Sequence, residues 1–261
     1  MRRRRAGDGD ARRTASLIEA LRSVAHEVAA EWSLELGKPF ALARHSYVTP
    51  AGECAVLKVT PAEDDESDEE GDALALWGGD GAVRLLRREP ERRALLLERA
   101  RPGRDLSEFP EDEATAFAVE VGQRLWRPAA EPFRWIGDHV PRWLAAEPSE
   151  LTPLALELYA SLDVGRSTLV HGDLQHHNIL DAGGRHVAID PKPMLGEPEY
   201  DVPPFLWNPL SYRMTVATTR RRLAAFAAAG LDEERMIAWT VIRGAYLGAD
   251  PDVVAVIRAL G

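Results

Sequence analysis

Residues 169–190 read LVHGDLQHHNILDAGGRHVAID, and this stretch decides how the rest of the chain is interpreted. It has two short apolar runs, LV and IL, on either side of a polar segment, followed by a Gly-Gly turn and a strand-like VAID. Short apolar runs bounded by polar or turn residues are typical of buried strands. The pattern therefore predicts strands that hold the polar segment 171–178 rigidly against a hydrophobic core.

The polar segment places His171, Asp173 and Asn178 at a fixed spacing. The order H-x-D-x-x-x-x-N matches the catalytic loop of protein-kinase-like phosphotransferases, in which the Asp accepts the proton of the substrate hydroxyl and the Asn holds a metal ion. Asp190 follows at the position of the second metal-binding acid, although the chain has Ile-Asp-Pro there rather than Asp-Phe-Gly.

The chemistry of phosphoryl transfer requires this combination of groups. The acceptor oxygen must be held in line with the transferred group, and a metal ion must neutralise the phosphates. Mg²⁺ prefers oxygen ligands and keeps several waters, so Asn178 and Asp190 are a sufficient contribution from the protein. Each residue alone is equally compatible with a solvent-exposed hairpin, but the set favours an ATP-dependent kinase.

Composition limits the other possibilities. The net charge of −10 argues against a general nucleic-acid binder, because such binding depends on Lys and Arg neutralising phosphates. No apolar run reaches the length of a membrane span, and the start lacks a signal peptide's apolar stretch. We expect a cytoplasmic monomer that begins with a disordered basic tail, residues 1–13.

The N-terminal third is predicted to contain a helix over 14–32, two strands over 39–48 and 54–59, and a buried Cys54. Lys58 is a charge inside the apolar strand AVLKV, so it should have an acidic partner. In the acidic run 63–72, Glu70 lies on the stripe that continues as the apolar face of the next helix, which makes it the expected partner. Glu66, one turn earlier, is the alternative.

The remaining pattern predicts an α+β, two-lobed protein-kinase-like fold. Residues 14–100 would form a small β-rich N-lobe with a hairpin between 83–86 and 94–98, and residues 101–261 would form a larger helical C-lobe. The LLLERARPG segment resembles the hinge of a two-lobed kinase, where adenine would bond to the backbone from Glu98 to Ala100. The predicted helices of the C-lobe span 111–127, 134–145, 151–162, 211–229, 232–247 and 251–260.

The chain resembles the aminoglycoside phosphotransferase family, within it the streptomycin 6-kinase and hydroxyurea phosphotransferase group. The segments that carry the resemblance lie between residues 47 and 208: AVLKV, ALALWGGDGAVRLL, ALLLERARPG, LVHGDLQHHNIL and AIDPKPMLGEPEYDVPPFLWNP. It implies a kinase that uses Mg²⁺ and ATP, with GTP as the alternative nucleotide, to phosphorylate a hydroxyl of a small molecule. The roles it implies are Asp173 as general base, Asn178 and Asp190 as metal ligands, Lys58 with Glu70 as nucleotide-positioning groups, and Asp201 and His171 as supports of the catalytic loop.

One feature departs from the family pattern, and another suggests the chemistry of the acceptor. The segment before Lys58 lacks a glycine-rich loop, so Ser46 and Tyr47 are expected to cover the phosphates instead. Glu197 and Glu199, with Trp207 and Trp143 as stacking faces, suggest a pocket for a cationic, polyhydroxylated acceptor, although core and solvent-exposed positions explain them equally well.

Two other functions stay open. The chain could be a non-catalytic kinase-like module that binds nucleotide. Less favoured is a metallohydrolase with ligands among His171, Asp173, His176 and His177, because their order fits no familiar zinc spacing.

Overall fold

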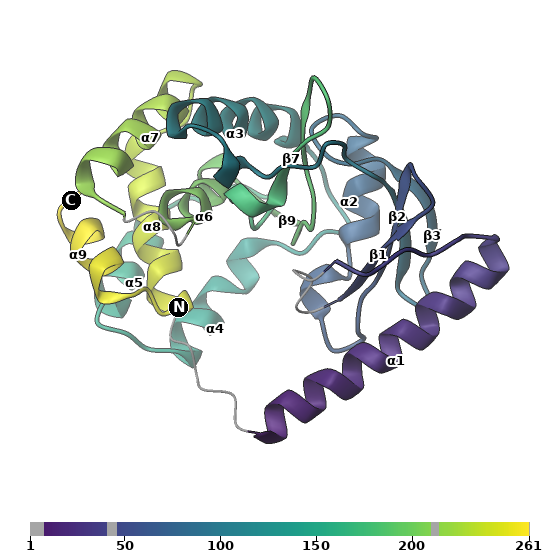
Figure 1. Ribbon diagram of the computed structural model, residues 1–261. Helices are drawn as coiled ribbons and strands as arrows, with labels where there is room; N and C mark the ends of the chain where they lie inside the picture. The colour runs from purple at the N-terminus through teal and green to yellow at the C-terminus, as the bar shows by residue number, and fades with distance from the viewer. Residues whose placement is uncertain (1–7, 41–45, 210–213, 261) are drawn as a thin grey trace.

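The computed structural model describes residues 8–40, 46–209 and 214–260 and shows two lobes (Figure 1). The N-terminal lobe contains helix α1 (Asp8–Trp32), a four-stranded sheet and helix α2 (Glu70–Trp77). The C-terminal lobe is mainly helical. This arrangement confirms the predicted two-lobed α+β fold.

The N-terminal sheet is antiparallel, with strand order β1-β2-β4-β3. Its strands are β1 (Tyr47–Ala51), β2 (Ala55–Val59), β3 (Leu85–Glu89) and β4 (Ala94–Glu98). Both predicted hairpins are present, but their strands are shifted by a few residues. Cys54 lies exposed in the β1–β2 turn, so the expected burial of this thiol was wrong. Residues 41–45 of the predicted first strand lie outside the described residues.

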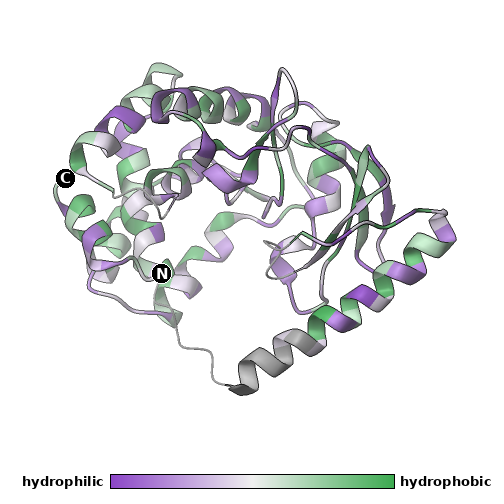
Figure 2. Cartoon of the chain, viewed as in Figure 1, coloured by the Kyte–Doolittle hydropathy of each residue, from purple (hydrophilic) through white to green (hydrophobic). Residues whose placement is uncertain are grey.

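Helices cover both faces of this sheet (Figure 1). Alternation along β2 directs Leu57 and Val59 into a core shared with α1, so the intervening Lys58 faces the side of α2. The amphipathic pattern of α1 is visible in Figure 2. This helix begins at Asp8, so residues 8–13 are helical rather than part of a disordered tail, and residues 1–7 lie outside the described residues.

The C-terminal lobe is built around α8 (Glu233–Leu247), which packs against five other helices of this lobe. These are α4 (Val140–Ala146), α5 (Thr152–Ser161), α6 (Val202–Trp207), α7 (Val216–Ala228) and α9 (Pro251–Arg258). Helix α3 (Glu111–Leu125) also belongs to this lobe. Helix α6 was not predicted, because its sequence VPPFLW contains two prolines. Both lie in the first turn, where a missing N–H removes no helical bond.

Short strands position the polar segment between the lobes. β5 (Arg127–Pro128), β6 (Thr168–Val170) and β9 (Met194–Gly196) form one sheet, and β7 (Ile179–Asp181) pairs with β8 (His186–Ala188). Val170 pairs with Met194 in the antiparallel β6–β9 ribbon, so the loop after β6 and the segment before β9 meet at the same end.

None of the helices in the described part of the chain has both the length and the apolar composition that a membrane span requires.

Candidate active site

The loop between β6 and β7 is fixed by close backbone packing. Gly172 has φ +82°, and a Cβ at this position would lie 2.0 Å from the carbonyl oxygen of Lys192. Only glycine tolerates both the left-handed conformation and this approach. The backbone N–H of Lys192 in turn donates to His171 O at 2.8 Å. The loop and the segment after β8 therefore form one rigid unit.

Asp201 braces this loop from below, as predicted. Its Oδ1 accepts from Gly172 N at 2.7 Å, and its Oδ2 accepts from His171 N at 2.7 Å and from Trp126 Nε1 at 2.9 Å. The carboxyl is fully buried, so these donors replace its lost hydration. His171 is also buried, with Nε2 bonded to Ile189 O and Nδ1 accepting from Asp173 N. Burial lowers the pKa of His171, which fits a neutral, structural side chain.

A further support of the loop is Arg243, which the sequence analysis missed. Its buried guanidinium donates to Gly172 O at 2.9 Å and to Tyr200 O at 3.0 Å, and it stacks over the Tyr200 ring. The signal was an arginine inside the apolar helix segment AWTVIRGAYL. A charge on such a buried face requires partners, and here these are loop carbonyls.

The loop presents Asp173 with one oxygen anchored. Asn178 Nδ2 donates to Asp173 O at 2.9 Å and to Asp173 Oδ2 at 3.0 Å, and Gln175 Nε2 donates to the same Oδ2 at 3.0 Å. Among the described residues, no hydrogen bond is made to Asp173 Oδ1. A half-buried carboxylate with one fixed and one open oxygen is suited to accept a proton from a hydroxyl group.

Lys58 joins the two lobes at this site. Its ammonium donates to both oxygens of Glu70, at 2.8 and 2.6 Å, and to Asp190 Oδ1 at 2.5 Å. The predicted choice of Glu70 over Glu66 is thus confirmed. Burial alone would lower the pKa of Lys58, but the two carboxylates outweigh this effect and raise it, so the side chain stays charged.

The donor set fits a magnesium ion. Because the amide nitrogen of Asn178 is committed to Asp173, its Oδ1 is left as a possible ligand. The Asp190 side chain is 51% exposed, and the charge of Lys58 lowers its carboxyl pKa, which keeps it anionic. Two hard oxygen donors and room for water match Mg²⁺. No group of three or more His, Cys, Asp or Glu able to hold a metal occurs among the described residues.

The four residues considered for a metallohydrolase do not converge. His176 stacks on Phe205 in the core at 3.9 Å, and His177 Nδ1 lies 2.8 Å from Asp105 Oδ2. His171 is held by Ile189 O. The histidines therefore point to three different partners, which disfavours a shared zinc ion.

Among residues 98–100 of the hinge, Ala100 keeps its backbone donor for a nucleotide. Glu98 N–H donates to Arg84 O, and Arg99 N–H donates to Cys54 O. The Glu98 carboxylate is bound by Arg185 and by Arg84 N, so its side chain has a structural role. Within the described residues, no hydrogen bond is made by Ala100 N–H. Ser46 is half-buried just before β1, and its contact with phosphates stays a prediction.

With this geometry established, similarity to known proteins can be stated. A family model described as "Aminoglycoside/hydroxyurea antibiotic resistance kinase" matches residues 41–252. The chain belongs to this family. A streptomycin 6-kinase of Streptomyces glaucescens is 32% identical over 85% of this chain and 80% of its own. A hydroxyurea phosphotransferase of Kitasatospora aureofaciens is 33% identical over 87% and 72%, respectively.

The fold is shared more widely. A choline/ethanolamine kinase family protein from Mesorhizobium loti has a TM-score of 0.65 over 93% of each chain, at 14% identity. This aminoglycoside/hydroxyurea kinase family member therefore has the kinase-like fold that its motifs predicted, and it is a phosphotransferase with an alcohol group as acceptor.

The acids predicted to contact the acceptor are engaged elsewhere. Glu197 is buried, its two oxygens bind the Arg235 guanidinium, and it also accepts from Trp239 Nε1 at 2.5 Å. Glu199 Oε1 accepts from Asp232 N at 3.1 Å. Both acids thus stabilise the start of α8, and the predicted acceptor contact of Glu197 is wrong because its carboxylate is fully paired.

The aromatic residues proposed for the acceptor differ in their surroundings. Trp143 packs against Tyr246 and His139, and the Tyr246 hydroxyl lies 3.1 Å from that of Tyr200, whose carbonyl binds Arg243. Trp143 therefore belongs to an aromatic group behind the catalytic loop. Trp207 is half-buried at the end of α6, and its role stays a prediction.

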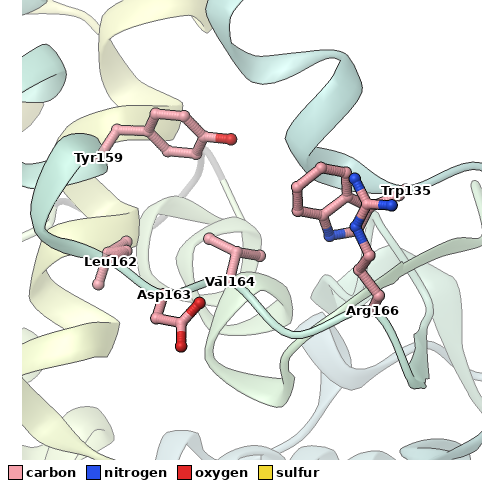
Figure 3. A pocket seen from close by; sticks show the side chains of 6 residues that line it. All are labelled: Trp135, Tyr159, Leu162, Asp163, Val164 and Arg166. Carbon is pink, nitrogen blue, oxygen red and sulfur yellow. The ribbon is translucent and has the colours of Figure 1, made fainter.

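A hollow of about 400 Å³ lies apart from this chemistry (Figure 3). It is lined by Trp135, Tyr159, Leu162, Asp163, Val164 and Arg166. Trp135 Nε1 donates to Gly165 O, and Arg166 stacks over the Trp135 ring at 3.6 Å. Gly165 lies beside Gly196, at the opposite end of the β6–β9 ribbon from the catalytic loop. This hollow contains none of the predicted site residues.

Proposed function

We propose that the protein transfers the γ-phosphoryl group of ATP to a hydroxyl group of a small, polar, cationic molecule. The observation that carries the proposal is the Lys58 ammonium between Glu70 and Asp190, next to an Asn178 amide anchored to Asp173. This set supplies a phosphate-binding cation, two metal-binding oxygens and a base, which are the groups that phosphoryl transfer needs.

The reaction follows from these positions. Asp173 Oδ1 orients the acceptor hydroxyl and takes its proton. The acceptor oxygen forms a bond to the γ-phosphorus, while the bond from that phosphorus to the β–γ bridging oxygen breaks and its electron pair leaves with ADP. Asn178 and Asp190 would hold Mg²⁺, which would supply positive charge to the phosphates. Lys58 positions the α and β phosphates, and the Ala100 N–H donates a hydrogen bond to the base of the nucleotide.

Charge suggests the class of acceptor. The chain carries a net charge of −10. Its acidic segment 63–72 contacts the C-terminal lobe through two ion pairs, Glu69 with Arg134 and Glu66 with Lys192. A negative field favours cationic ligands. The relatives named above are described as acting on streptomycin, which is cationic, and on hydroxyurea, which is neutral. We place streptomycin-like guanidino- and amino-cyclitols first and small neutral hydroxyl compounds second.

A product assay tests this proposal. Purified protein with Mg-ATP should convert streptomycin or a related cyclitol to a monophosphate, with one ADP formed per product, as measured by mass spectrometry and ³¹P NMR. The acceptor KM should rise with salt, because ion pairing with the ligand is screened. Glu199→Gln should leave this KM unchanged, because Glu199 is engaged with Asp232. Nucleotide binding without product for any acceptor would instead support a non-catalytic binding module.

A further inference from the structure

Lys192 is placed beside the catalytic loop by its backbone, not by its charge. Its N–H donates to His171 O at 2.8 Å, and its carbonyl oxygen lies against Gly172. These bonds involve no side-chain atom of Lys192. A lysine at this position is therefore not needed to fold the loop.

The ammonium of Lys192 has an exposed partner across the interlobe boundary. It pairs with Glu66 in the 3₁₀ helix η1 (Asp65–Ser67), and the two side chains are 41% and 52% exposed. Exposed pairs of this kind contribute little to stability, because water and salt screen them. The pair is therefore weak enough for a stronger anion to replace Glu66.

Only Pro191 separates Lys192 from Asp190, and the backbone bond to His171 places Lys192 beside the loop that carries Asp173. These are the proposed base and the proposed metal ligand, so Lys192 borders the space between the acceptor and the nucleotide. The transferred phosphoryl group must pass through this space, with negative charge on its three equatorial oxygens.

The neighbouring cationic side chains are bound to other groups. Lys58 is enclosed by Glu70 and Asp190, and Arg243 is buried against backbone carbonyls. Arg134 binds Glu69 and the carbonyl of Asp65. Gln175, in the catalytic loop itself, is neutral and bonded to Asp173. Lys192 differs from these groups because its one ion pair, with Glu66, is solvent-exposed on both sides and therefore easily exchanged for phosphate.

We propose that Lys192 is a further catalytic residue, whose ammonium leaves Glu66 and binds an oxygen of the γ-phosphoryl group during transfer. This inference rests on the proposed function of the site. In the reaction, the acceptor oxygen bonds to phosphorus, ADP leaves with the electrons of the broken P–O bond, and the hydroxyl proton goes to Asp173. Lys192 keeps its protons and contributes only charge and hydrogen bonds.

Comparison of nucleotide states separates this role from a structural one. Lys192→Met should bind Mg-ADP with wild-type affinity, because no γ-phosphoryl group is present. Its affinity for Mg-ADP with aluminium fluoride, which mimics the planar transferring group, should fall at least tenfold in calorimetry. Its kcat should fall on the order of 10²-fold, the usual effect of removing one charge-stabilising donor. Lys192→Arg should recover part of both losses.

Glu66→Gln is the matched control, because it removes the ion pair but keeps Lys192. It should retain wild-type kcat and wild-type affinity for the aluminium fluoride complex. Equal losses in Glu66→Gln and Lys192→Met would show that the residue acts only as a link between the lobes. Unchanged aluminium fluoride binding in Lys192→Met would also overturn the proposal. If the wild type phosphorylates no acceptor, the proposed function fails, while this binding comparison still decides the role of Lys192.

Discussion

Lys58 and Asp190 are 132 residues apart in the chain, and their side chains meet at 2.5 Å between Nζ and Oδ1. The contact joins an inner strand of the N-terminal sheet to the residue that follows Ile189 after β8. Asp190 has φ +56°, a left-handed conformation that is uncommon outside glycine and occurs at functional sites. We expect Asp190 to bind the metal ion and Lys58 to bind phosphate when Mg-ATP is present.

Replacing Lys58 should therefore affect both binding and stability. Lys58→Met should weaken Mg-ATP binding at least tenfold in calorimetry, because the cation that positions the phosphates is lost. It should also lower the free energy of unfolding by roughly 3–5 kcal/mol, because Glu70 would remain buried without a cation. Lys38→Met, at an exposed position, is the control and should change neither quantity. Wild-type nucleotide affinity in Lys58→Met would remove the residue from the nucleotide site.

Arg243 should influence turnover without touching a substrate. Arg243→Met removes the donors to Gly172 O and Tyr200 O and leaves two buried carbonyls without these bonds. We expect a loss of about 2–4 kcal/mol in urea unfolding and a lower kcat from a less ordered loop. The exposed Arg258, paired with Glu150, provides the control variant Arg258→Met, which should be close to wild type. Full activity in Arg243→Met would show that the loop does not depend on this support.

Acid should destabilise the fold through His176. Burial, reinforced by the nearby Arg222 cation, lowers the pKa of His176 to about 3. The unfolded chain then binds a proton that the folded chain does not, so this contribution to stability is complete above about pH 6.5 and is lost as the pH falls towards 3. One histidine contributes at most about 1.4 kcal/mol per pH unit.

A pH series of urea unfolding in wild type and His176→Gln measures this contribution. The variant should be less stable at pH 7 because it loses the stacking on Phe205, but its stability should fall less steeply between pH 6 and pH 4. His26→Gln, on the exposed face of α1, should keep the wild-type slope. Identical slopes in all three proteins would contradict a buried, neutral His176.

The pairing of Lys58 with Glu70 could be predicted from helical spacing, whereas the bracing position of Asp201 was implied by the family resemblance. Glu70 stood out from the acidic run because helical spacing placed it on the apolar stripe, and the structure buries it to 1% exposure. The loop residues were recognisable because their spacing is set by local backbone geometry between two short strands. Local spacing is preserved in the sequence, and the structure confirms the Lys58–Glu70 pair and the contacts of Asp201 with the loop, while the catalytic and metal-binding roles stay predictions.

The acceptor side could not be predicted because its residues depend on distant partners. Glu197 looked like a loop acid, and only the fold reveals Arg235 and Trp239 beside it. Arg243 was overlooked for the same reason, since its partners are backbone carbonyls in the catalytic loop and in η5 (Pro198–Asp201). The residue pattern of a segment does not show which distant side chain or carbonyl will pair with a charge in that segment.

We propose that Asp173 orients the acceptor hydroxyl and accepts its proton. The most direct measurement is the rate of phosphoryl transfer from Mg-ATP by the wild type and by Asp173→Ala, for the acceptor identified in the product screen, together with calorimetric Mg-ATP affinity. We expect kcat to fall on the order of 10²- to 10⁴-fold in Asp173→Ala, while nucleotide affinity stays within about twofold. Near-normal turnover in Asp173→Ala, with intact nucleotide binding, would contradict this proposal.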